Sequence, residues 1–244
     1  MSDLLVVKDR SGVRLIVMNR PDRRNALNTD LTRELLISLE DADDDEAVGA
    51  VVLTGAGPSF CAGADLAEFK DLTPERAHLV EARARLTANL HGIFRLMKKP
   101  VVTAINGAAM GGGAGLALAG DMAVMGETAK LGFPEVTHGI VAAIVMSNLV
   151  RQCGRKAAFE LVALGQPIVS LRALELGMVN RVVRNEDVVK EAVAIAERLA
   201  GVSRPAMALT KQLFHEVSEL PFDAALEKGR EANERMRGFR QAGA

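Results

Sequence analysis

The chain has 244 residues, and 49% of them are hydrophobic, which is enough to build a sizeable core in one large domain or two small ones. Its 30 Lys and Arg residues nearly balance its 31 Asp and Glu residues, so a formal net charge of -1 gives no reason to expect nucleic acid or anionic lipid as the main partner. The absence of Trp and Tyr argues against a stacking platform for single-stranded nucleic acid.

The first half of the chain alternates between strand-like and helical patterns. Short apolar runs predict strands at 4–8, 13–18, 50–53, 101–105 and 122–125, and periodic patterns predict helices at 29–43, from about 73 up to Pro100, and at 114–119. In the first of these helices, Leu31, Leu35 and Leu39 lie four residues apart on one face.

The second half of the chain is mainly helical. From about residue 140 the pattern predicts helices, with one short strand near 179–183. An α/β core followed by a helical C-terminal segment is therefore the expected architecture.

The two cysteines, Cys61 and Cys153, lie far apart, and neither belongs to a CxxC pair or a Cys/His cluster. They predict reduced thiols and no metal site. The first residues lack the basic region and long apolar run of a secretion signal, and residues 107–126 are rich in glycine and contain Asp121, which makes a poor membrane span. We therefore expect a cytoplasmic protein with no membrane partner.

Glycines punctuate two loops, one at 54–65 and one at Gly111–Gly113. A dinucleotide fingerprint would need a third glycine at Leu116 or at Phe60, and the Gly-Lys-Ser/Thr sequence of a phosphate loop is absent, so a nucleotide site is not expected. Glycine N–H groups at the start of a helix can instead bind an oxyanion. Spacing alone leaves open whether the glycines do this or only permit close helix packing.

Short motifs stand in a fixed order along most of the chain. They are Asn19-Arg20-Pro21 with Asn25-Ala26-Leu27, Leu53-Thr54-Gly55, Phe60 to Leu66 (FCAGADL), Lys99 to Gly107 (KPVVTAING), Gly111-Gly112-Gly113, Ala119-Gly120-Asp121, Gly132-Phe133-Pro134-Glu135 and Gly177-Met178-Val179-Asn180. This ordered set resembles the crotonase (enoyl-CoA hydratase/isomerase) superfamily.

The resemblance implies an α/β fold in which ββα units wind in a spiral over residues 1–190, followed by a helical C-terminal segment at 191–244 that serves trimerisation. It also implies an acyl-CoA thioester as substrate and a homotrimer or dimer of trimers. Neither a metal nor a separate cofactor is expected, because CoA arrives as part of the substrate.

The resemblance also carries roles to individual positions. The backbone N–H groups of Ala64 and Gly112 correspond to the oxyanion-hole donors that hold the thioester oxygen as it becomes an enolate. Glu135 corresponds to one of two catalytic glutamates, and the position of the other is Gly115 in this chain. The positions expected to line the substrate are Arg24, Ala26, Ala62, Asp65, Leu66, Met110, Gly111, Gly115, Pro134 and His138. Asp65 and Asp121 are also candidates for structural capping, and Cys61 for packing.

One carboxylate instead of two changes the expected reaction. Glu135 has apolar neighbours in Leu131 and Phe133, so burial would raise its pKa and make it a base near neutral pH. Water addition needs two proton-transfer groups, whereas moving a double bond needs one. The pattern therefore predicts a Δ3,Δ2-enoyl-CoA isomerase in which Glu135 is the single acid/base.

Other interpretations remain open from the sequence. One is an enoyl-CoA hydratase of fatty acid β-oxidation, in which another residue, for which His138 is a candidate, supplies the missing acid. Gly115 would alternatively leave room for a bulky acyl group. A non-catalytic RNA-binding or assembly subunit is a further alternative, although the predicted helix that holds Arg83 and Arg85 also holds Glu81.

The C-terminal end departs from the family pattern. Relatives close with an acidic-glycine pair, then Ala-Phe and a Lys-Arg-Pro-like ending, and residues 239–244 here match none of these. The resemblance therefore leaves the contacts to the adenine end of CoA and the assembly open. Lys211 and Lys228 are candidates for CoA phosphate contacts, but we expect them to be solvated surface lysines.

Overall fold

The computed structural model describes residues 3–70 and 72–241. Within these residues a six-stranded sheet has the order β1-β2-β3-β5-β7-β10. Its strands are β1 (Leu5–Arg10), β2 (Val13–Met18), β3 (Ala50–Gly55), β5 (Val101–Ile105), β7 (Met122–Gly126) and β10 (Arg181–Val183). β1 and β2 pair antiparallel, and every other neighbouring pair in this sheet is parallel.

A smaller sheet lies beside the first, with the order β4-β6-β8-β9. Its strands are β4 (Ser59–Cys61), β6 (Ala108–Met110), β8 (Lys130–Gly132) and β9 (Ile168–Val169). The chain passes from the larger sheet to the smaller one three times, from β3 to β4, from β5 to β6 and from β7 to β8, and a helix follows each passage. This arrangement confirms the predicted α/β spiral of ββα units.

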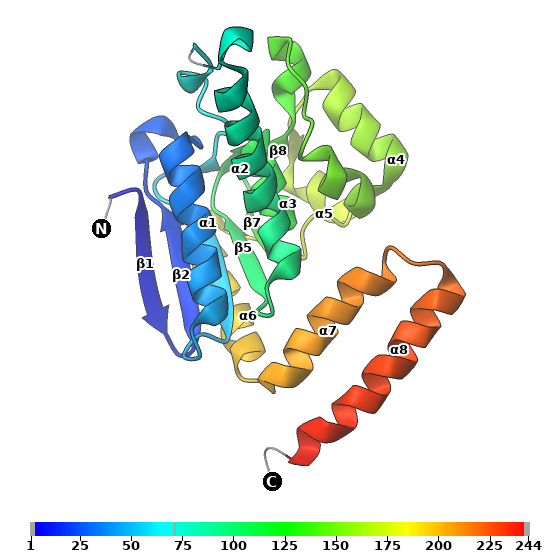
Figure 1. Ribbon diagram of the computed structural model, residues 1–244. Coiled ribbons are helices and arrows are strands. Elements are labelled where there is room, and N and C mark those ends of the chain that lie inside the picture. The colour runs from blue at the N-terminus through cyan, green and yellow to red at the C-terminus, as the bar shows by residue number, and fades with distance from the viewer. Residues whose placement is uncertain (1–2, 71, 242–244) are drawn as a thin grey trace.

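Helices cover both faces of the larger sheet (Figure 1). On one face pack α1 (Thr29–Asp44), α2 (Ala77–Leu96) and α3 (Gly112–Ala119), and on the other packs α6 (Val188–Ala200). Along β3, Val51 and Leu53 join the first cluster, whereas Ala50 and Val52 join the cluster under α6. A strand buried on both faces explains the continuous apolar run in the sequence.

The predicted apolar face of α1 is fully buried. Leu31, Leu35 and Leu39 are each 0% exposed, and burying each leucine contributes roughly 1.5–3 kcal/mol. The Asn28 side chain caps the helix by accepting a hydrogen bond from Leu31 N at 3.0 Å.

The predicted helix from about residue 73 begins instead with a 3₁₀ turn at Pro74–Arg76, and α2 follows from residue 77. The helix buries its apolar side chains only toward its C-terminal end, where Leu90 and Phe94 are buried while Leu79 is 39% exposed. The other short 3₁₀ turns are Pro21–Arg23, Glu68–Lys70, Pro134–His138, Asn185–Asp187 and Arg237–Gln241.

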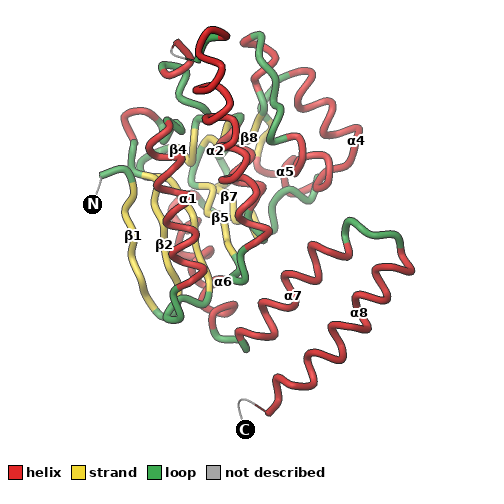
Figure 2. The backbone as a smooth tube through the Cα atoms, viewed as in Figure 1, coloured by secondary structure: helices red, strands yellow, loops and turns green. Residues whose placement is uncertain are grey.

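The C-terminal helices α7 (Arg204–Val217) and α8 (Phe222–Met236) form an antiparallel pair that extends away from the sheets (Figures 1 and 2). The proposed segment boundary at 190 falls inside α6, which packs on the sheet. Two further helices, α4 (Met146–Leu164) and α5 (Ser170–Glu175), follow β8. Of residues 239–244, which do not match the pattern expected from the resemblance, residues 242–244 lie outside the described residues.

Lys211 corrects a prediction, because it is 5% exposed and not solvated. Its Nζ donates to Asp121 Oδ2 at 2.7 Å and to the Lys99 carbonyl at 2.8 Å. Asp121 Oδ2 also accepts a hydrogen bond from Val101 N at 2.7 Å, which confirms the structural role expected for this aspartate. Over residues 3–70 and 72–241, each helix is too short or too polar to span a lipid bilayer.

Candidate active site

Two loops meet at the ends of β4 and β6. Gly63 has φ +91°, and a Cβ on it would lie 2.7 Å from the Met110 carbonyl oxygen and 3.3 Å from Gly112 N. The two backbones therefore touch, and only a residue without a Cβ fits between them.

Ala64 presents a free backbone donor beside this contact. In the parallel bridge between Leu27 and Ala64, Leu27 N donates to Gly63 O at 2.8 Å and Asp65 N donates to Leu27 O at 3.2 Å. The bridge thus engages the Gly63 carbonyl and the Asp65 N–H, which flank Ala64. The N–H of Ala64 itself donates no hydrogen bond to another described residue.

Gly112 supplies a second donor close to the first. It is the first residue of α3, where a backbone N–H has no acceptor within the helix. A Cβ on Gly112 would lie 3.9 Å from Ala64 N, so the two N–H groups are near neighbours. Two adjacent unpaired N–H groups, one at a helix N-terminus, can stabilise a developing oxyanion.

Glu135 lies across from these donors, in the 3₁₀ turn Pro134–His138 that follows β8. Its Oε1 is 2.8 Å from where a Cβ on Gly111 would be, so the carboxyl group packs against the turn between β6 and α3. Its Oε2 is buried and has no hydrogen-bond partner among the described residues.

Burial is the main influence on the pKa of Glu135, and it raises that pKa above its ordinary value. The backbone N–H of Glu135 and the positive charge of His138 act in the opposite direction and are weaker. A carboxyl group with a raised pKa and an unpaired oxygen is suited to moving a proton.

A hollow of about 280 Å³ joins the two donors and the carboxyl group. The predicted site residues that line it are Ala26, Ala62, Ala64, Asp65, Leu66, Gly111, Gly112, Pro134, Glu135 and His138. Arg23, Gly63 and Ile140 also line it, and the sequence had not singled them out.

Three predicted lining residues lie elsewhere. Arg24 adopts φ +50° and its exposed side chain is not part of the wall, whereas the neighbouring Arg23 is. Met110 does not line the hollow either; its carbonyl packs against Gly63. Gly115 is buried one helical turn after Gly111, to whose carbonyl its N–H donates at 2.9 Å, and it does not line the hollow itself.

The space beyond Gly115 is filled, which excludes the idea that this glycine leaves room for a bulky acyl group. A Cβ at this position would lie 2.3 Å from Val145 Cγ1 and 2.7 Å from His91 Cε1. Both neighbours are buried, with 5% and 6% exposure.

Asp65 lines the hollow, but its carboxylate is engaged in holding the loop. Its Oδ2 accepts two hydrogen bonds from the Arg20 guanidinium, each 3.0 Å, and its Oδ1 accepts one from Ala67 N at 3.2 Å. Arg20 also donates to the Ala26 carbonyl. This pair therefore braces the loop that carries Ala64.

Arg83 of α2 braces the same loop from another side. Its Nη2 donates to the Leu27 carbonyl at 2.8 Å, and its Nε lies 3.7 Å from Glu68 Oε2. Glu68 in turn accepts from Thr29 N with both oxygens at 2.9 Å. No local pattern indicates this role, because Arg83 and Leu27 are 56 residues apart in the chain.

Cys61 is buried next to the loop, and its Sγ lies 3.1 Å from the Asn25 carbonyl, to which it donates. Burial raises the pKa of this thiol to about 12, so it stays protonated at neutral pH. The cysteine packs, as the sequence indicated, and is not a nucleophile.

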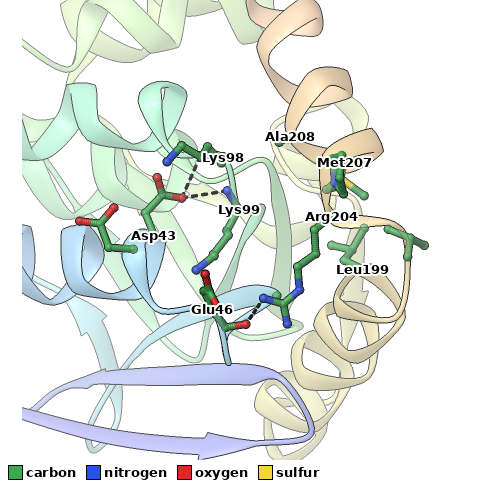
Figure 3. A pocket seen from close by; sticks show the side chains of 12 residues that line it. Asp43, Glu46, Lys98, Lys99, Leu199, Arg204, Met207 and Ala208 are labelled. Carbon is green, nitrogen blue, oxygen red and sulfur yellow. Dashed lines mark hydrogen bonds between the residues drawn. The ribbon is translucent and has the colours of Figure 1, made fainter. Parts of the chain in front are cut away.

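A second hollow, of about 370 Å³, lies at the opposite ends of the strands, near Gly49 before β3 and Lys99 before β5 (Figure 3). Three of its charged side chains hydrogen-bond to the backbone: Asp43 Oδ1 accepts from Lys98 N and Lys99 N at 2.8 and 3.0 Å, Lys99 Nζ donates to the Ala42 carbonyl at 2.7 Å, and Arg204 donates to the Glu46 carbonyl. The first hollow is the better candidate for a reaction site, because it combines unpaired backbone donors with the buried, unpaired Oε2 of Glu135.

The family model described as enoyl-CoA hydratase/isomerase matches residues 8–241. A putative enoyl-CoA hydratase of Thermus thermophilus is 42% identical over 86% of this chain and 83% of that protein. The 2,3-dehydroadipyl-CoA hydratase of Escherichia coli is 36% identical over 95% of this chain and 89% of its own length. The crystal structure of an enoyl-CoA hydratase from Mycobacterium smegmatis superposes with a TM-score of 0.91, with 30% identity over 96% of this chain and 91% of that one.

Proposed function

This chain belongs to the enoyl-CoA hydratase/isomerase family, an enzyme family, and from that premise we propose that it moves the double bond of a 3-enoyl-CoA thioester to the 2-position. The observation that carries the proposal is the difference between the two carboxylates that line the hollow, Glu135 and Asp65. Glu135 has a raised pKa and an unpaired oxygen, whereas Asp65 is held by Arg20. Among the described residues that line the hollow, Glu135 alone is a carboxylate free to act as an acid/base.

In the proposed reaction, the thioester oxygen binds at the N–H groups of Ala64 and Gly112. Glu135 removes a proton from C2, and the electrons of that C–H bond pass into an enolate that the two donors stabilise. The double bond then forms between C2 and C3 as Glu135 returns the proton to C4. Donors of this kind contribute about 3–4 kcal/mol each to transition-state stabilisation in other enzymes. No metal or separate cofactor takes part.

Hydration of a 2-enoyl-CoA is the second candidate reaction. The relatives compared above are named as hydratases. His138 lines the same hollow as Glu135 and lies three residues along the same 3₁₀ turn, which places both on one side of it. Its imidazole is therefore placed where it could serve as a second proton-transfer group.

The alternative of an RNA-binding subunit finds no support in the charges of α2. Arg83 faces Glu68 at 3.7 Å, and Arg85 pairs with Glu81 at 2.6 Å. Basic side chains paired in this way do not form the positive stripe that RNA binding requires.

A paired spectrophotometric assay tests the proposal. One arm supplies a 3-enoyl-CoA and follows the conjugated 2-enoyl product, and the other supplies a 2-enoyl-CoA and follows its loss to the 3-hydroxy product. We expect isomerisation without fast hydration, and we expect Glu135→Gln to abolish it. Fast hydration by the unmodified enzyme would contradict the one-base proposal and favour the second candidate.

A further inference from the structure

Gly115 sits where the resemblance places a second catalytic carboxylate, and the structure shows what occupies that space. Val145, the residue just before α4, approaches most closely, with Cγ1 at 2.3 Å and Cβ at 3.0 Å from the position of an added Cβ. A β-branched side chain that is 5% exposed has little freedom to rotate away. Val145 therefore leaves no room for a side chain at position 115.

His91 is a different kind of neighbour. Its Cε1, the carbon between the two ring nitrogens, is the atom nearest Gly115, so the polar edge of the imidazole faces α3. Neither nitrogen has a hydrogen-bond partner among the described residues. Burial, helped by the charge of Arg83, lowers the pKa of His91 to about 4, so the ring is neutral at pH 7 and keeps one N–H to donate.

We propose that Val145 determines the reaction specificity of this enzyme, because its side chain fills the space that a second carboxylate would need and so restricts the site to one-base chemistry. This inference rests on the proposed isomerase function. His91 is the group that would receive such a carboxylate, because its unpaired N–H faces the same space. Removing the Val145 side chain while adding a carboxylate at position 115 should therefore open the way to hydration.

Water addition in the double variant would need no further reactant. The new carboxylate takes a proton from water as the water oxygen bonds to C3, and protonated Glu135 gives its proton to C2. Solvent then returns the proton from the new carboxylate to Glu135.

Four proteins test the inference: the unmodified enzyme, Gly115→Glu, Gly115→Glu combined with Val145→Gly, and a matched control that combines Gly115→Gln with Val145→Gly. Glycine is chosen at 145 because it removes both Val145 contacts, leaving only the approach of His91 Cε1 at 2.7 Å, and because glycine is accepted at a helix N-cap. Melting temperature, isomerisation and hydration are measured for each protein.

We expect Gly115→Glu alone to melt about 4–10 °C lower, because overpacking strains the core. Adding Val145→Gly should restore at least half of that loss. The double variant should hydrate a 2-enoyl-CoA at least about 100-fold faster than the glutamine control, which is the lower range of general acid–base catalysis.

Two results would overturn the inference. One is that Gly115→Glu alone is as stable as the unmodified enzyme and hydrates as fast as the double variant. The other is a folded, isomerising double variant that hydrates no faster than the glutamine control.

If the double variant does not fold, Gly115→Ala with and without Val145→Gly still decides the steric argument. Val145→Gly should rescue Gly115→Ala, and simply additive losses in melting temperature would refute it. An unmodified enzyme without isomerase activity would instead refute the proposed function, which this alanine pair does not test.

Discussion

Lys211 and Asp121 form an ion pair of 2.7 Å in which the lysine side chain is 4% exposed and the aspartate side chain 19% exposed. The pair joins α7 to the start of β7, and the Lys99 carbonyl and Val101 N complete its hydrogen bonds. A buried ammonium group thus fastens the first of the two projecting helices to the sheet.

Removing this lysine should destabilise the fold. Lys211→Met leaves the Asp121 carboxylate without its ammonium partner, and His215, whose Nε2 lies 3.5 Å from Asp121 Oδ1, makes no hydrogen bond to replace it. We expect a loss of about 3 kcal/mol in the free energy of unfolding, the lower end for breaking a buried pair. Urea denaturation measures it. The matched control is Lys228→Met, because Lys228 pairs with Glu231 on the surface of α8 and should change stability by less than about 0.5 kcal/mol. Equal losses in both variants would contradict a special role for Lys211.

The pH dependence of isomerisation should report Glu135. The base acts only when deprotonated, so kcat/KM falls as the pH drops through its pKa, and burial places that fall above the ordinary value of 4.5. Because the charge of His138 lowers the pKa of Glu135, His138→Gln should move the acidic limb of the profile to higher pH. Initial rates between pH 4 and pH 9 measure both. An unmoved or downward-shifted limb in His138→Gln would show that this charge does not act on Glu135.

Arg83 should be a positioning residue, since it holds the carbonyl of Leu27 beside the loop that carries Ala64. Arg83→Gln should lower kcat about 10- to 100-fold with a smaller change in KM, because a displaced donor weakens transition-state contacts most. Arg83→Lys should recover part of kcat. Arg85→Gln is the control on the exposed side of α2, where the side chain pairs only with Glu81. Steady-state kinetics measure all three, and a pure KM effect would point to substrate binding instead.

Gly63 and Gly229 should respond to alanine in opposite ways. At Gly63 the φ of +91° and the Met110 carbonyl at 2.7 Å leave no space, so Gly63→Ala should cost about 1–3 kcal/mol and most of the activity. At Gly229, inside α8, nothing lies within 4 Å, so Gly229→Ala should stabilise by about 0.5–1 kcal/mol. Thermal unfolding compares the two, and a harmless Gly63→Ala would mean that the loops do not touch in solution.

We expect the α7–α8 pair to be covered by other subunits in a homotrimer or a dimer of trimers. Phe214, Phe222 and Leu226 are 66%, 76% and 58% exposed on these helices, an apolar content that favours burial in an assembly. Light scattering coupled to size-exclusion chromatography should give three or six chains. Phe222→Asp should shift the protein toward smaller species, whereas Phe159→Asp on α4, where the side chain is 71% exposed, serves as the comparison. A monomeric unmodified protein would refute the assembly.

The features that the sequence predicted correctly are those that depend on a local pattern of residues, such as the longer strands. The apolar runs at β2, β3 and β5 were readable because each strand is five or six residues long, while β4, β6 and β8, with three residues each, are too short to show a period. Ala64, Gly112 and Glu135 were found through the resemblance, and the structure brings them to one hollow.

What the sequence missed depends on contacts between distant segments. Arg23 lines the hollow instead of Arg24 because the backbone turns into the left-handed region at residue 24. Lys211 can be buried because its ammonium group pairs with Asp121, which lies 90 residues away in the sequence. The filling of the Gly115 space by Val145 also arises only when α3 and α4 pack.

The spiral also determines how the reacting groups are delivered. Ala64 follows β4, Gly112 follows β6 and Glu135 follows β8, and these three strands are consecutive neighbours in the smaller sheet. Their mutual distance is therefore tied to strand spacing, about 4.8 Å per step, and not to the length of the intervening segments. Insertions or deletions in the outer helices can remodel substrate preference over evolutionary time while the geometry of proton transfer stays constant.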